Sequence, residues 1–175
     1  IPEMGGFSIL FGLASGIFLS ILFFSNGLVF LFAAFLTILI TGIIGIADDL
    51  LGIRQKTKAW LPIFAAVPLM ATQAGVSTMF IPFLGTVNFW IFYPLFIIPA
   101  AITVASNASN MLAGYNGLEA GLGFIASIFV GVAGVLIGRL EVAILMFSLA
   151  GSMLAFLKFN YYPAKVFMGD VGTFT

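Results

Sequence analysis

Long apolar runs alternate with short polar clusters along the whole chain of 175 residues. A helix needs about 20 apolar residues to cross the hydrocarbon core of a bilayer. Six runs come near that length, and we predict a membrane-spanning helix for each: 7–24, 28–47, 59–74, 89–106, 118–138 and 142–157. The pattern therefore predicts an all-α integral membrane protein, a polytopic helical bundle.

Two of the predicted spans contain prolines. Pro62 and Pro68 lie in the third, and Pro94 and Pro99 lie in the fourth. Proline removes a backbone donor and crowds the preceding turn, so we expect kinks there. Between these spans, residues 75–88 mix β-forming side chains with a proline and a glycine, which predicts either a short hairpin or an interfacial loop.

Four polar clusters are separated from one another by two predicted crossings each. They are residues 2–6, 48–58, 107–119 and 160–172. An even number of crossings returns the chain to the same side, so all four clusters belong on one membrane face. Unpaired polar groups are costly in hydrocarbon, and we expect the clusters to meet at the water boundary as one site. The connectors 25–27, 75–88 and 139–141 fall on the opposite face.

Charge is scarce and unevenly placed. Charged residues make up 7% of the chain, against about 25% in soluble domains. All of them except Arg139 and Glu141 fall on the cluster face, and that face holds five of the six Lys and Arg residues. The positive-inside rule then predicts that the cluster face is cytoplasmic. The net charge is zero, so nothing indicates nucleic acid as a partner.

The chain contains neither cysteine nor histidine. This excludes a disulfide, a thiolate nucleophile, and the commonest general base and zinc ligand from this stretch. Any acid–base or metal chemistry must use Asp, Glu, Asn or Lys. The first residue is Ile, and both ends lie inside polar clusters, so we interpret the chain as part of a longer protein that contributes a single transmembrane catalytic domain.

Asp48 and Asp49 end the second predicted span. Helix C-termini disfavour anions, so a nearby cation is expected. The pair fits either a solvated helix end paired with Arg54 or Lys58, or a general base beside a group that positions a metal or phosphate.

Asp170 is a lone carboxylate between glycines, either a turn aspartate or a ligand. Asn107 and Asn110 would share a helix face, where they either cap the helix end or offer oxygen ligands to Mg²⁺. Three lysines are either positive-inside residues or phosphate-binding groups: Lys56, Lys58 and Lys165. Acids, amides and lysines together indicate Mg²⁺-dependent phosphate chemistry, with Mn²⁺ as an alternative cation.

The four clusters together resemble the polyprenyl-phosphate N-acetylhexosamine-1-phosphate transferase family, glycosyltransferase family 4. The matching stretches are I-P-E-M-G-G (1–6), D-D-L-L-G-I-R-Q-K-T-K (48–58), N-A-S-N-M-L-A-G-Y-N-G-L-E (107–119) and V-F-M-G-D-V-G (166–172). The resemblance implies transfer of a sugar-1-phosphate from a UDP-sugar to a membrane polyprenyl phosphate, with release of UMP. By analogy it also implies about ten spans in the whole protein, of which this chain would hold the second to the seventh.

The resemblance implies roles for individual residues. Asp48, Asp49 and Lys58 match catalytic positions, with one acid as the base and the lysine on the diphosphate. Asn110 and Asp170 match the Mg²⁺-binding positions. The substrate-binding positions are matched by Glu3, Asn107, Gly114, Asn116 and Glu119.

Ala113 and Asn116 stand where bacterial branches of the family carry aspartates. The L-A-G-Y-N-G-L-E form resembles the eukaryotic and archaeal branch instead, which implies UDP-N-acetylglucosamine as donor and dolichyl phosphate as acceptor. The alternatives within the family are a phospho-N-acetylmuramoyl-pentapeptide transferase and a bacterial undecaprenyl-phosphate N-acetylglucosamine-1-phosphate transferase.

Outside the family, the alternative is a transporter or a structural membrane subunit. The prolines of the third and fourth spans favour this alternative. The scarcity of charged residues within the predicted spans, where only Glu119 at the start of the fifth is charged, argues against it. The expected location is the plasma membrane or the endoplasmic reticulum, with the active site facing the cytoplasm. The oligomeric state is left open, with a homodimer as one option.

Overall fold

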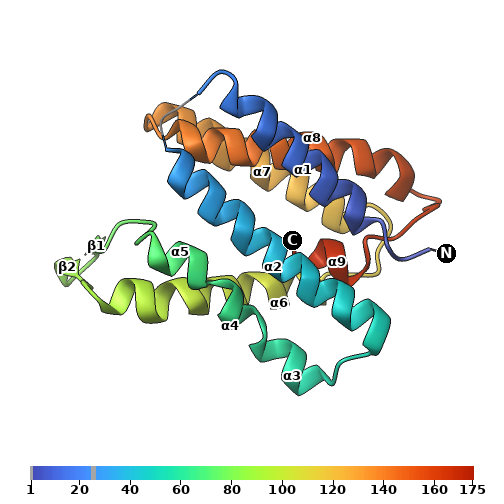
Figure 1. Cartoon of the computed structure of the whole chain (residues 1–175), viewed down its shortest axis with the longest axis horizontal. Helices are drawn as coiled ribbons and strands as arrows, with labels where there is room; N and C mark the ends of the chain where they lie inside the picture. The colour runs from blue at the N-terminus through green and yellow to red at the C-terminus, as the bar shows by residue number, and fades with distance from the viewer. Residues whose placement is uncertain (1, 25–26) are drawn as a thin grey trace.

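The computed structural model describes residues 2–24 and 27–175, so two positions of the 25–27 connector lie outside it. Over the described residues the chain is mostly helical, with several long helices lying beside one another (Figure 1). In chain order the elements are α1 (Gly6–Ile21), α2 (Leu28–Leu51), α3 (Gln55–Trp60), α4 (Pro62–Ala65), α5 (Val67–Ala71), β1 (Thr78–Ile81), β2 (Gly85–Asn88), the π-helical turn η1 (Tyr93–Ile97), α6 (Ile98–Met111), α7 (Leu118–Leu136), α8 (Leu140–Asn160) and α9 (Gly169–Thr173).

Within the described residues, α2, α7 and α8 are long and apolar enough to cross a membrane, with 24, 19 and 21 residues. The apolar helix α1 has 16 residues, or about 24 Å at the rise of an α-helix. The predicted fold class, an all-α integral membrane protein, is confirmed. The number of crossings stays a prediction.

The two proline-containing segments are broken, as expected. The predicted span 59–74 is divided among α3, α4 and α5, and Pro62 and Pro68 lie in the first turns of the latter two. In the next segment, Pro94 lies at the start of η1 and Pro99 at the start of α6. Proline has no backbone N–H, and the first turn of a helix is where that donor is not needed.

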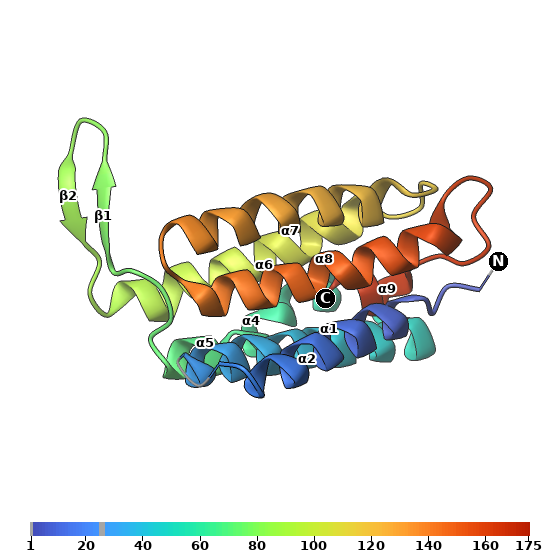
Figure 2. The same ribbon diagram turned by 90° about the horizontal axis from the view of Figure 1, so that it is seen from above.

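Residues 75–88 contain the hairpin, which confirms one of the two predicted alternatives. β1 and β2 pair antiparallel, with Met79 opposite Val87 and Phe80 opposite Thr86. Figure 2 shows the hairpin standing across the long axes of the helices, at the end away from α9 and the N-terminus.

Two buried clusters organise the helices around α1. The first joins α1, α7, α8 and the segment before α9: Ile9, Ala120, Met153, Phe156 and Met168. The second joins α1 to α2: Leu13, Ile17, Leu31 and Phe35. Because Met168 belongs to the first cluster, burial of apolar surface also fixes the loop that leads to Asp170.

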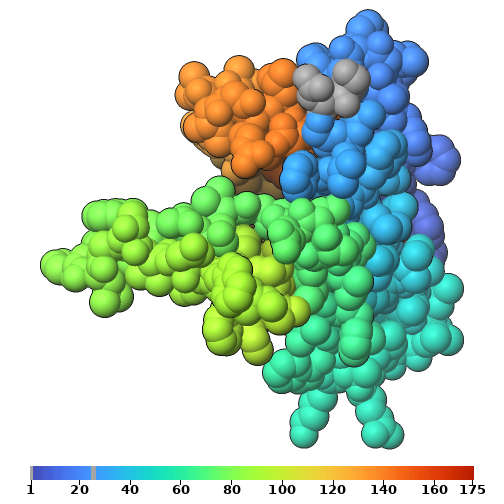
Figure 3. All heavy atoms as spheres, turned by 60° about the vertical axis from the view of Figure 1, so that its left-hand side comes forward, coloured from blue at the N-terminus to red at the C-terminus, as the bar shows by residue number. Residues whose placement is uncertain are grey.

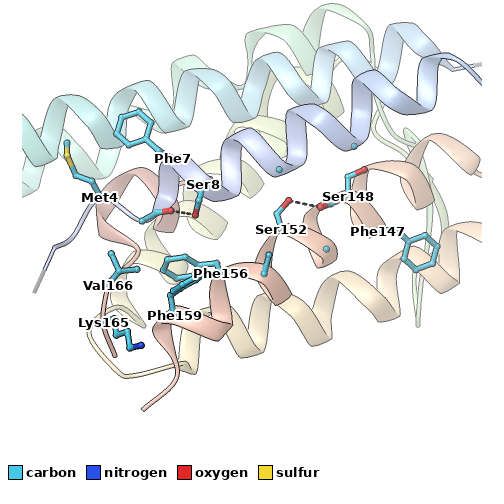
Figure 4. Close-up of a pocket in the computed structure, with 15 residues that line it drawn as sticks. Met4, Phe7, Ser8, Phe147, Ser148, Ser152, Phe156, Phe159, Lys165 and Val166 are labelled. Carbon is cyan, nitrogen blue, oxygen red and sulfur yellow. Dashed lines mark hydrogen bonds between the residues drawn. The ribbon is translucent and has the colours of Figure 1, made fainter. Parts of the chain in front are cut away.

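Helix α1 approaches α8 closely through small residues. Gly12 faces Ser152 and Gly16 faces Ser148, and a Cβ added to either glycine would overlap the opposite serine. Small residues let helix backbones come together in this way inside membranes. Figure 4 shows the two serines along α8 beside the apolar groove that this contact borders.

Candidate functional site

The short helix α9 carries Asp170 and lies against both α1 and α2 (Figure 1). A Cβ on Gly45 of α2 would overlap the carbonyl of Asp170, and a Cβ on Gly6 of α1 would overlap the backbone of Gly172. Glycine at these two positions therefore allows the backbone of α9 to sit directly on the neighbouring helices. This packing sets the position of the Asp170 side chain.

The N-terminal polar cluster is joined to the last one through the main chain. The N–H groups of Gly5 and Gly6 donate to the carbonyls of Phe167 and Met168, at 2.9 and 2.8 Å, and the Phe167 N–H donates to Pro2 at 2.8 Å. These bonds hold residues 2–6 beside the segment that enters α9. Glu3 is thereby brought to the site.

Asp49 connects the end of α2 to the start of α9. Its carboxylate accepts hydrogen bonds from the backbone N–H groups of Asp170 (3.0 Å) and Val171 (3.2 Å). The first N–H groups of a helix have no partner within the helix and carry partial positive charge, so a carboxylate stabilises that end. In the structure, Asp49 orients α9 and the acid that it carries.

Lys58 lies between two carboxylates. Its Nζ forms ion pairs with Asp48 and with Asp170, at 2.6 Å from Oδ2 of the latter. The Asp48 side chain is only 7% exposed, and its other oxygen accepts the Ile53 N–H at 2.8 Å. The predicted pairing with Lys58 is confirmed for Asp48 but not for Asp49, which accepts the N–H groups of α9 instead. The alternative that Asp48 lies at a solvated helix end is wrong, because the following turn and Lys58 cover its carboxylate.

The charges of this group depend on one another. Burial lowers the pKa of Lys58, but the hydrogen bonds to Asp170 and Asp48 outweigh it, so the pKa lies above its ordinary value. Burial raises the pKa of Asp170, and the neighbouring Asp48 raises it further against the effect of Lys58. One ammonium group does not offset two ionised carboxylates, so the three side chains together favour further positive charge nearby.

The end of α6 is helical, as expected, and supplies both asparagines. Asn110 donates through Nδ2 to Asp170 and, at 2.8 Å, to the Thr173 hydroxyl. Asn107 donates instead to the carbonyls of Ala59 (3.0 Å) and Thr103 (2.7 Å). Because Ala59 follows Lys58, this bond helps to place the lysine. A role for Asn107 in substrate binding stays a prediction.

A polar cavity of about 350 Å³ opens beside these groups, and all four polar clusters contribute to its wall. Its lining residues are Glu3, Asp49, Ala113, Gly114, Glu119, Phe167, Met168, Gly169 and Asp170. The prediction that the clusters meet is thereby confirmed. Glu119, in the first turn of α7, has one carboxylate oxygen that is buried without a partner among the described residues. Asn116 is exposed in the loop before α7 and is not part of this lining.

Two larger hollows are apolar and lie away from the acids. One, of about 760 Å³, runs along α1 and α8 (Figure 4), and the other, of about 830 Å³, runs along α1 and α2. Lys165 and three serines are the polar residues of the first, which contains neither acid nor amide. The smaller cavity is therefore the candidate site, because it alone of the three combines carboxylates with glycine-lined backbone.

Sequence reasoning missed two residues of the site. Asn160 accepts the Gly117 N–H and donates to the Val166 carbonyl, both at 2.9 Å. It thus ties together the two loops that flank the cavity. The position of Asn160 at the end of an apolar helix could have indicated this role from the sequence. Thr173, which accepts from Asn110, gave no signal because its partner lies 63 positions away.

The oxygen atoms of the site are of the kind that bind Mg²⁺, but few of them converge on one point. Asp170 and Asn110 present carboxylate and amide groups beside a cavity with three further acids. Among residues 2–24 and 27–175, no three acidic side chains converge as a ready-made metal cage. Mg²⁺ commonly takes one or two carboxylates and completes its shell with water and substrate phosphates. Asn110 and Asp170 stay the predicted ligands for such a metal. In the structure, Oδ1 of Asp170 accepts the Asn110 amide and Oδ2 pairs with Lys58, so a metal would replace one of these contacts.

The fold and the cavity define a helical membrane protein with a charged site at the helix ends. The family model for glycosyl transferase family 4 matches residues 31–175. The chain belongs to this family.

Curated relatives agree with the family match. The chain is 42% identical to a protein of Saccharolobus solfataricus and 40% identical to one of Sulfolobus acidocaldarius, over 99% of its length in both cases. Both are provisionally named UDP-N-acetylglucosamine–dolichyl-phosphate N-acetylglucosaminephosphotransferase, and the chain spans 55% of the length of each. It is also 33% identical, over 85% of its length, to the phospho-N-acetylmuramoyl-pentapeptide-transferase of Clostridium perfringens, of which it covers 56%.

Proposed function

We propose that the whole protein transfers N-acetylglucosamine-1-phosphate from UDP-N-acetylglucosamine to a dolichyl-type polyprenyl phosphate, a first membrane step of lipid-linked glycan assembly. The observation that carries this proposal is the position of Lys58 between Asp48 and Asp170, beside a cavity lined by all four polar clusters. The names of the two archaeal relatives support the choice of donor and acceptor.

The proposed reaction is a single displacement. A phosphate oxygen of the lipid bonds to the β-phosphorus of the donor, while the bond from that phosphorus to the bridging oxygen breaks and UMP leaves with the electron pair. Lys58 offsets negative charge on the diphosphate. The acid pair Asp48–Asp49 takes the proton of the lipid phosphate when that phosphate arrives protonated. The absence of Cys and His from the chain favours direct transfer over a covalent enzyme intermediate.

The cavity lining suggests how the donor is held. Gly114, with a φ of 100°, has nothing within 4 Å of an added Cβ, and its backbone is open to a ligand. Glu3, in the segment before α1, and Glu119, in α7, reach the same wall, where their carboxylates can accept hydrogen bonds from ribose or sugar hydroxyls. For Asn116, which lies in the same loop as Gly114, we propose a contact with the uridine of the donor.

We assign Mg²⁺ to Asn110 and Asp170, with Mn²⁺ as an alternative. When bound, the metal supplies charge neutralisation for the diphosphate and the leaving UMP. The site is proposed to face the cytoplasm, in the plasma membrane or the endoplasmic reticulum, since five of the six Lys and Arg residues lie at this end.

The test is a donor comparison with the full-length protein. UDP-N-acetylglucosamine and UDP-N-acetylmuramoyl-pentapeptide, each radiolabelled in the sugar, are offered in parallel with polyprenyl phosphate and Mg²⁺. We expect label in the lipid fraction and release of UMP with the first donor. Preferential transfer of the muramoyl-peptide would overturn the donor assignment, and transfer of neither would overturn the proposed activity.

A further inference from the structure

The hairpin at the opposite end of the molecule is uncharged and, among the described residues, its strands pack mainly on each other. Residues 76–90 contain no charged side chain. Four large apolar residues of this stretch are strongly exposed: Phe80, Phe83, Leu84 and Trp90. The strands pack on each other, and Figure 3 shows the green segment projecting away from the blue and orange helices. Exposed apolar groups concentrated in this way mark an interaction surface.

The register gives the hairpin two different faces. Side chains alternate along a strand, and directly opposed residues share a face. Met79, Ile81 and Val87 therefore lie on one face, opposite a face that carries Thr78, Thr86 and Asn88. Phe80 shares the second face but lies next to the apolar tip. The hairpin is thus amphipathic, with one apolar side, one largely polar side, and an apolar tip.

The tip holds an aromatic residue where the backbone disfavours one. Pro82 and Phe83 occupy the centre of a turn closed by the Leu84 N–H on the Ile81 carbonyl at 3.1 Å. Phe83 has a φ of 75°, a conformation for which such turns prefer glycine or asparagine. Trp90, at the base, also has a positive φ of 41°. Both side chains are exposed, so no contact within the described chain explains why aromatic residues occupy these strained positions.

The orientation of the hairpin identifies what it meets. The hairpin runs across the helix axes at the end of the bundle (Figure 2), so helices that cross a bilayer would place it along the membrane surface rather than along the membrane normal. Trp90 and Tyr93 lie at its base, and these residue types prefer the lipid–water interface. The absence of charge from residues 76–90 also favours lipid over a partner that would bind through ion pairs.

We propose that the hairpin is a membrane-surface anchor in the leaflet opposite the candidate site. Phe83, Leu84 and the face of Met79 enter the boundary between headgroups and acyl chains, together with Phe80 next to the tip, while Thr78, Thr86 and Asn88 remain in water. The anchor fixes the depth of η1 and α6, which begin at its base. Since α6 ends at Asn110, the anchor also sets the level of one side of the polar cavity.

The test measures depth at single labels in the full-length protein in nanodiscs. Cysteine is introduced as Phe83→Cys or Leu84→Cys at the tip, with Thr86→Cys as the matched control on the polar face. Residues 1–175 contain no cysteine, and any outside this range is first replaced. Each cysteine receives a nitroxide, and its collision rates with oxygen and with a water-soluble nickel chelate are compared by electron paramagnetic resonance.

We expect the ratio of oxygen to nickel collisions to be above one at positions 83 and 84 and below one at position 86. Tip labels as accessible to nickel as the control would overturn the proposal. Tip labels shielded from both reagents would also overturn it, because they would place another protein segment or a second copy on the tip. Phe83→Gly, which relieves the positive φ, should keep the fold and lower the ratio at position 84.

Discussion

The two ends of the helical bundle are held together in different ways. At the site end, the decisive contacts join residues far apart in the sequence: Lys58 and Asp170 are 112 positions apart, and Asp49 and Asp170 are 121 apart. At the hairpin end, the charged contact is local, since Arg139 forms an ion pair with Glu141 two residues away. Burying charge is costly unless every group is paired. The site end therefore retains a costly arrangement, which is typical of a region where position matters for chemistry.

This difference predicts that substitutions at the site end have large effects and that similar substitutions at the other end have small ones.

Removing the positive charge of Lys58 should have the largest effect on stability. Lys58→Met leaves Asp48 and Asp170 buried without their partner, which should lower the free energy of unfolding by about 3–5 kcal/mol. Arg139→Met removes one partner of the more exposed pair with Glu141, and should cost less than about 1 kcal/mol. Thermal unfolding of both variants in detergent measures the difference. Equal losses would contradict the contrast between the two ends.

Neutralising Asp170 should mainly affect turnover. Asp170→Asn keeps the size of the side chain but removes the charged oxygen proposed to bind Mg²⁺, so UMP release should fall about 100-fold or more. The Mg²⁺ dependence of the remaining activity should weaken. Glu141→Gln, the control at the other end, should retain nearly normal activity. Normal turnover by Asp170→Asn would remove the metal assignment.

A single methyl group on α2 tests how α9 is positioned. Gly45→Ala pushes a Cβ into the carbonyl of Asp170, and overpacking of this kind costs about 1–3 kcal/mol. Gly121→Ala in α7 has nothing within 4 Å of the new Cβ, and should be neutral or stabilise the helix by about 0.5–1 kcal/mol. Unfolding and UMP release are measured for both. Loss of activity in Gly121→Ala but not in Gly45→Ala would contradict the role of this packing.

The pattern of apolar and polar positions predicted the architecture well at low resolution. Counting crossings was sufficient to bring the four clusters to one end, because a span must return the chain to the same side after every second crossing. Prolines indicated where the third and fourth segments break. How deeply these broken segments enter the membrane could not be predicted from the sequence, because hydropathy reports composition and not the path of the backbone.

Individual roles within the site were harder to predict. The pairing of Lys58 with Asp48 followed from their proximity in sequence and from charge. The hydrogen bonds of Asp49 to the start of α9, and of Asn160 to two loops, depend on how distant segments pack. Asn107 shows the same limit: its spacing from Asn110 indicated a shared face, yet the structure uses its amide to hold the Ala59 carbonyl.

The central claim is that the four polar clusters form one site on one membrane face. Single cysteines in place of Gln55, Tyr115 and Tyr162, all exposed at the site end, are tested in sealed vesicles with a membrane-impermeant maleimide. Thr86, on the polar face of the hairpin, serves as the reference for the other side. The account predicts that the first three react from one side of the membrane and Thr86 from the other. Reaction of Gln55 and Tyr115 from opposite sides would contradict it.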